Sequence, residues 1–243
     1  MNSQPNATSI TRQHAGPHLG MLAIVYTILF NAGLCFVSAF GIPFGVKQPY
    51  WPPPWDSPDV IVSYFQTHAT AALLCVFLQY GAVIPLGIYT ATIVSRLRFL
   101  GIDAAGPYIA LFGGFLTVFN SIVAGSITWG MLHPGITQDA TVTRALYYIA
   151  YALGGPGFSV PMGLLIAGVC IPAAIGKLLP RWLVVFGLVL AIAGVLSWLN
   201  LVFPQVLFLI PLVRFPGFIW LIATGFLLPK AVHQRLRPAE MRA

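Results

Sequence analysis

Charged residues are scarce in this sequence. Only 7% of its 243 residues are Asp, Glu, Lys or Arg, whereas 58% are hydrophobic. A soluble domain typically carries about 25% charged residues. So few charges cannot cover a water-facing surface, so the composition excludes an ordinary soluble protein and indicates a polytopic membrane protein.

Carboxylates are the scarcest charged groups, and none of them falls inside an apolar run. The five Asp and Glu residues all lie in connections or in a tail. Proton-coupled pumps and many cation carriers use intramembrane carboxylates, so the sequence argues against such a mechanism, although not against facilitated passage. No histidine lies well inside an apolar run either, which disfavours a haem held between buried histidines.

Cysteine is sparse as well. The three cysteines, Cys35, Cys75 and Cys170, lie inside apolar runs and form neither a disulfide framework nor a Cys-x-x-Cys pair. His68 and His133 have no ligand spacing around them, so we interpret both as surface side chains. The net charge of +7 accompanies no nucleic-acid-binding motif. We therefore expect no metal, no cofactor and no nucleic-acid partner.

What the sequence has in abundance is long apolar segments. About 20 apolar residues at roughly 1.5 Å each cross a bilayer. Six segments meet this requirement, the last counted with part of the ambiguous stretch 203–213: 19–41, 69–95, 106–132, 145–175, 182–203 and a sixth ending near Leu228. We predict an all-α transmembrane bundle over residues 19–230, with short tails at 1–18 and 231–243.

The basic residues predict the orientation of this bundle. With six spans and the amino terminus inside, nine basic residues face the cytoplasm and three face outward, as the positive-inside rule expects. The inner nine are Arg12, Arg96, Arg98, Lys177, Arg181, Lys230, Arg235, Arg237 and Arg242, and the outer three are Lys47, Arg144 and Arg214. Both termini are then cytoplasmic.

The segment 106–132 carries small residues at every fourth position. Gly113, Thr117, Ser121 and Gly125 fall on one helical face. Small residues at this spacing allow another helix to approach closely inside a membrane. We therefore predict a central helix against which others pack.

The connection 42–68 is rich in proline and aromatic residues. Its sequence includes Trp51 and Trp55 on either side of three consecutive prolines. Tryptophan favours the membrane–water interface, so we expect an outward aromatic loop. Ser57, Pro58 and Asp59 then have the pattern of a helix start.

Uncharged polar residues recur near the middle of the apolar segments. On a straight-helix estimate, Asn31, Gln79 and Asn120 lie within roughly 6 Å of one depth, with Ser121 nearby and Ser159 after a Gly-Gly-Pro-Gly break. One interpretation is hydrogen bonding between helices. The other is a pocket beneath Trp51 and Trp55 that binds a ligand.

Arg214 also lies in a long apolar stretch. Near a helix end, such an arginine commonly extends to the lipid headgroups. The alternative is a cation that receives an anionic group, with Asn200 as a helper.

Ser159 belongs to a Gly-x-Ser tripeptide that loosely resembles the motif of rhomboid intramembrane proteases. A serine nucleophile needs a base within hydrogen-bond reach, and His233 falls beyond the last apolar segment. We therefore interpret Ser159 as a packing residue.

Two further stretches resemble a family of bacterial six-span inner-membrane proteins that is grouped only as a domain of unknown function. They are PLGIYTATI at 85–93 with Arg96-Leu97-Arg98, and Leu209-Ile210-Pro211 with RFPGFIW at 214–220. The resemblance implies a bacterial inner membrane and supplies no catalytic residues.

Three functions stay open at this stage. The first is a non-enzymatic protein that binds or passes a small neutral or apolar ligand through an outward pocket. The second is a structural or assembly subunit that packs on a membrane-protein partner or on a second copy. The third is a lipid-acting enzyme that uses Arg214. We rank them in this order because no acid, base or metal set is evident.

Overall fold

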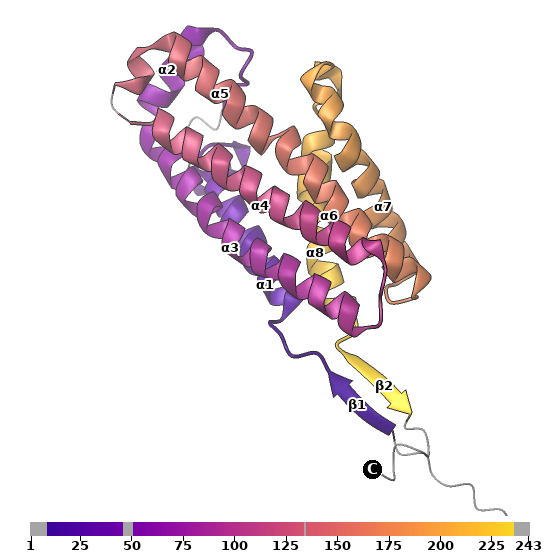
Figure 1. Ribbon diagram of the computed structural model, residues 1–243. Coiled ribbons are helices and arrows are strands. Elements are labelled where there is room, and N and C mark those ends of the chain that lie inside the picture. Colours follow the sequence, from indigo (N-terminus) through magenta and orange to yellow (C-terminus); the bar gives the residue numbers. More distant parts are fainter. Residues whose placement is uncertain (1–8, 46–50, 134, 236–243) are drawn as a thin grey trace, which may run out of the picture.

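The structure is a bundle of long helices with one short strand pair at its end (Figure 1). The computed structural model describes residues 9–45, 51–133 and 135–235. Its helices are α1 (Leu19–Cys35), α2 (Pro58–Thr67), α3 (Ala69–Phe99), α4 (Ala105–Met131), α5 (Ala140–Gly154), α6 (Pro156–Ile175), α7 (Arg181–Leu196) and α8 (Leu209–Leu227). The strands are β1 (Ser9–Gln13) and β2 (Ala231–Arg235).

Five helical segments are long and apolar enough to cross a membrane: 69–99, 105–131, 140–175, 181–201 and 204–227. These confirm the prediction of a helical membrane protein. The first apolar segment forms the shorter α1, of 17 residues. The ambiguous stretch resolves into a short turn, Pro204–Val206, followed by α8, so its second half belongs to the last helix.

The long helices form a closed ring. Each packs against the next in the order α1, α3, α4, α6, α7, α8, and α8 returns to α1. The core between them is filled by large side chains such as Trp220, Tyr89 and Phe158. The outward faces carry exposed apolar residues such as Phe112 and Ile192, as expected for surfaces that meet lipid.

The predicted small-residue ridge is used inside the chain. A Cβ atom placed on Gly113 would lie 2.5 Å from the backbone of α6, and one on Gly125 would lie 3.2 Å from Tyr80 of α3. Thr117, between them, is fully buried. The ridge is therefore where α4 meets α6 and α3, and the observation that favoured an assembly subunit has an explanation within one copy.

The Gly-Gly-Pro-Gly stretch interrupts a helix, as expected from its proline and glycines. α5 ends at Gly154, and α6 begins at Pro156, with Gly155 between them at φ −89°, ψ −101°. The N–H of Phe158 bonds to the Gly155 carbonyl at 3.1 Å, which leaves the Gly154 carbonyl without its helical partner. Pro161 has no N–H and cannot serve the Gly157 carbonyl. The break and Pro161 thus leave the Gly154 and Gly157 carbonyls without their usual helical donors.

The tails differ from the expectation of short segments without regular structure. β1 and β2 pair antiparallel, with Thr11 opposite His233. The two strands are more than 200 residues apart in the sequence. Neither has enough apolar alternation for the sequence to predict a strand. It places the two ends of the described chain together at one end of the bundle (Figure 1).

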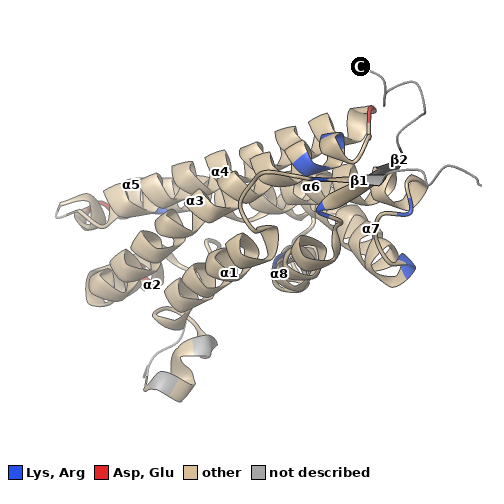
Figure 2. Cartoon of the chain, turned by 90° about the horizontal axis from the view of Figure 1, so that it is seen from below, with Lys and Arg blue, Asp and Glu red and all other residues tan. Residues whose placement is uncertain are grey.

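The Lys and Arg residues gather at this strand end (Figure 2). Among the described residues they include Arg96 and Arg98 at the end of α3, and Arg181 at the start of α7. Arg144 and Arg214 lie away from it, on α5 and α8. The helices thus keep the charge asymmetry that the sequence predicts.

Candidate functional site

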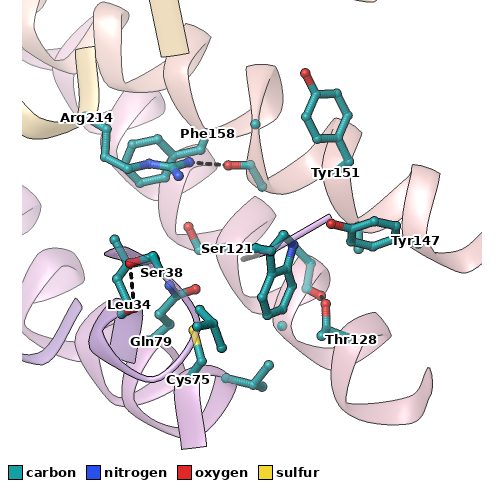
Figure 3. Close-up of a pocket in the computed structure, with 18 of the residues that line it drawn as sticks. Leu34, Ser38, Cys75, Gln79, Ser121, Thr128, Tyr147, Tyr151, Phe158 and Arg214 are labelled. Atoms are coloured by element: carbon teal, nitrogen blue, oxygen red, sulfur yellow. Dashed lines mark hydrogen bonds between the residues drawn. The ribbon is translucent and has the colours of Figure 1, made fainter. Parts of the chain in front are cut away.

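A pocket of about 390 Å³ lies in the half of the bundle opposite the strand pair. Its walls come from the second half of α1, the first half of α3, the second half of α4, α5, and the first turns of α6 and α8. Most of its lining is apolar, and a few polar groups point into it (Figure 3). Ligand sites typically combine these properties at volumes of about 300–1,000 Å³.

The predicted aromatic loop covers one side of this pocket, where residues 51–55 all line it. The ring of Trp51 packs against Phe65 of α2 at 5.5 Å between centroids, and Trp55 packs against Tyr151 of α5 at 5.7 Å. The hydroxyl of Tyr147 donates a hydrogen bond to the Pro52 carbonyl. α2 begins as predicted, because the Ser57 hydroxyl accepts the Val60 N–H at 3.4 Å.

Arg214 is the cationic group of the pocket (Figure 3). One Nη2 proton is donated to the Gly154 carbonyl, which the helix break has left free. Its guanidinium carbon lies 4.5 Å from the centre of the Phe158 ring and 5.4 Å from that of Phe30. Its Nε is buried and has no hydrogen-bond partner among the described residues.

Tyr26 is a second polar group of the lining without a partner. The side chain is 2% exposed, and no described residue hydrogen-bonds its hydroxyl. Tyr26 and Arg214 both lie near Phe30: the Tyr26 ring centroid is 6.0 Å from that of Phe30, and the guanidinium carbon is 5.4 Å from it. A buried donor without a partner costs roughly 1–3 kcal/mol, so two of them beside one cavity require an explanation.

The structure brings five of the eight predicted site residues to this pocket. Gln79, Ser121, Trp51, Trp55 and Arg214 all line it. Gln79 makes no hydrogen bond to another described residue. Ser121 donates to the Thr117 carbonyl of its own helix at 2.7 Å.

The other three predicted residues are not part of the pocket lining. The Asn31 amide donates to the Thr27 carbonyl of its own helix at 2.8 Å. The Asn120 amide donates to the Gly157 carbonyl at 2.6 Å, replacing the N–H that Pro161 lacks. Ser159 is fully buried, and its hydroxyl has no partner among the described residues. For Asn120, bonding between helices was the correct interpretation.

Several aromatic side chains are among the lining residues that the sequence reasoning missed. Tyr26 and Phe30 line the pocket from α1, and Tyr147 and Tyr151 line it from α5. Both pairs have the i, i+4 spacing that places side chains on one helix face. Asn200, expected beside Arg214, instead accepts a hydrogen bond from the Tyr151 hydroxyl.

The described lining of the pocket contains no Asp, Glu or His. Across the described residues, no three His, Cys, Asp or Glu side chains are placed to hold a metal ion. Comparison with protein-family models, with curated proteins and with solved structures gives no match to this chain. The functional argument therefore depends on the pocket itself, whose arrangement suits binding.

Proposed function

We propose that this chain is a multi-pass membrane protein that binds, or passes, a small and largely apolar ligand in the pocket beneath residues 51–55. The observation that carries the proposal is the enclosure itself. Six helices and an aromatic loop converge on one cavity of about 390 Å³, into which Gln79 presents an amide without a described partner. A cavity of this kind is the usual form of a ligand site.

We place the pocket on the outer side of a bacterial inner membrane. The basic side chains gather at the opposite end of the bundle, which supports a cytoplasmic strand end (Figure 2). The pairing of β1 with β2 supports both ends lying on one side, and with it an even number of crossings. Five long segments and α1 together supply six.

α1 is short for this role but sufficient. Its 17 residues rise about 26 Å at 1.5 Å each, against a hydrocarbon core of about 30 Å. Residues Ala39–Phe44 continue in the same apolar stretch as a 3₁₀ helix. Local thinning of the bilayer accommodates a mismatch of this size at modest cost.

The experiment is native mass spectrometry of the protein extracted gently from its own membrane. We expect a reproducible bound small molecule that Ser121→Phe, which fills the cavity, removes. Asn31→Leu is the matched control, because the Asn31 amide bonds within its own helix away from the pocket. A protein that is always empty, or a ligand retained equally by both variants, would refute the proposal.

A further inference from the structure

One end of the pocket is chemically different from the rest. Arg214 enters it from α8, while the other polar lining groups are uncharged side chains and backbone. None of the five Asp and Glu residues lies inside an apolar segment. The guanidinium charge is therefore not balanced by a carboxylate of its own span, although burying an unpaired charge is costly.

The bond to Gly154 accounts for only one of the N–H donors of Arg214. The Gly154 carbonyl accepts one N–H of Arg214, whereas an arginine has five, in a planar fork. Among the described residues the buried Nε has no partner, and neither has the hydroxyl of Tyr26, which lines the same pocket. A residue needed only to cap a helix break would not require a second buried donor in the lining of the same pocket.

The surrounding rings decide how a ligand can approach. Phe158 and Phe30 lie against the guanidinium, within 4.5 Å and 5.4 Å of its carbon. Its face is therefore occupied, and the N–H edge is what remains for a ligand. That edge matches the two oxygens of a carboxylate, and charge-assisted bonds of this kind are the strong ones.

We propose that the ligand is a monocarboxylate with an apolar body, whose carboxylate binds Arg214 and Tyr26 and whose body lies toward Trp51 and Trp55. This inference depends on the proposed binding function and specifies the charge of its ligand. One cation balances one negative charge, which favours a carboxylate over a doubly charged phosphate monoester. The apolar end is provided by the loop of residues 51–55.

The test uses octanoate and octanamide, which share a chain and differ in charge. Binding of each is measured by equilibrium dialysis to the full chain in nanodiscs of neutral phospholipid, and the Ser121→Phe protein gives the background from lipid. We expect octanoate to bind about tenfold or more tightly than octanamide, because hydrogen bonds to charged groups are the stronger ones. This comparison needs no substitution of the arginine.

Arg214→Gln should then abolish the preference and leave octanamide binding nearly unchanged, since glutamine retains an N–H for Gly154. Arg214→Lys should retain part of the preference, because it keeps the charge without the planar fork. Arg144→Gln is the matched control, since it removes one positive charge from α5 outside the pocket.

The outcomes separate the two proposals. If octanamide binds as tightly as octanoate and Ser121→Phe abolishes both, the pocket function stands and the carboxylate inference is wrong. A preference that survives Arg214→Gln would also overturn the inference. If the unsubstituted chain binds neither probe, the function and the inference fall together.

Discussion

The side-chain amide of Asn120 on α4 donates a hydrogen bond of 2.6 Å to the carbonyl of Gly157 on α6. In an uninterrupted helix that carbonyl would receive the N–H of residue 161, which is a proline. The asparagine therefore completes a neighbouring helix rather than its own. This bond links α4 to the first turn of α6, close to the break between α5 and α6. At the same break, the Gly154 carbonyl accepts a hydrogen bond from Arg214.

We expect Asn120→Leu to lower the free energy of unfolding by about 1–2 kcal/mol, because a partly buried carbonyl loses its partner. The measurement is an unfolding titration of the protein in mixed micelles. Asn31→Leu serves as the comparison, since its amide donates to the Thr27 carbonyl of the same helix. If both variants lose the same free energy of unfolding, the hydrogen bond between α4 and α6 stabilises the protein no more than the bond within α1 does.

A second prediction concerns the contact between α4 and α6. A Cβ atom on Gly113 would lie 2.5 Å from the Leu165 nitrogen and from the Pro161 oxygen, which are backbone atoms that cannot rotate away. Gly113→Ala should therefore destabilise the protein by about 1–3 kcal/mol, the usual cost of overpacking.

Gly130→Ala tests the same change on the same helix. A Cβ atom there meets no atom within 4 Å, and Gly130 does not have a positive φ. We expect stability within about 0.5 kcal/mol of the unsubstituted chain. If thermal unfolding of both alanine variants is equally unaffected, α4 and α6 do not pack as closely as described.

These contacts show which parts of the fold are readable from sequence. Long apolar segments, the helix break and the start of α2 at Ser57 follow from local chemistry that one segment carries by itself. The small-residue ridge of α4 was visible too, since its spacing is local. The helix that packs on this ridge could not be predicted, because small residues at this spacing allow any neighbouring helix to approach.

The pocket was only half predictable for a related reason. A polar side chain in a membrane helix can satisfy itself by bonding to the carbonyl four residues earlier, as Thr27, Asn31 and Ser121 do. Polarity alone therefore does not identify the inward face. On α1 that face carries Tyr26 and Phe30, next to the polar stripe in sequence but turned away from it.

The strand pair makes a third prediction, which depends on pH. His14 follows β1, and its Nε2 lies 2.9 Å from the Ser95 hydroxyl, while its Nδ1 is buried without a described partner. Burial, and next the charge of Arg96, lower the pKa of His14 from 6.5. His14 therefore accepts a proton less readily when the segment after β1 is docked against α3 than when that segment is free.

The lowered pKa of His14 determines how its docking depends on pH. Docking of His14 is fully effective above about pH 6.5 and weakens as the pH falls through the lowered pKa, because only the undocked histidine accepts a proton readily. Hydrogen exchange of residues 9–17, corrected for the intrinsic rate, should rise as the pH drops from about 7 to about 5. His14→Gln should flatten this dependence. An unchanged slope in that variant would assign the effect to another group.

The last prediction concerns the membrane topology, on which the pairing of β1 with β2 bears directly. β1 and β2 pair, so residues on both must lie on one side of the membrane. The five longest apolar segments alone would place them on opposite sides. We therefore propose that α1 crosses as well. Single cysteines at Thr11 and Asp59, in a background without the native cysteines, report on this crossing directly.

We expect a membrane-impermeant maleimide applied to intact cells to label Asp59→Cys, and to label Thr11→Cys only after permeabilisation. Gln138→Cys should behave like the former, and Asp103→Cys like the latter, since α3 and α4 each reverse the side. Labelling of Thr11→Cys and Asp59→Cys from the same side would mean that α1 does not cross. The strand pair could then not form across five spans, so this result would contradict the six-span topology. If both positions are labelled only from the inside, the outward pocket is contradicted as well.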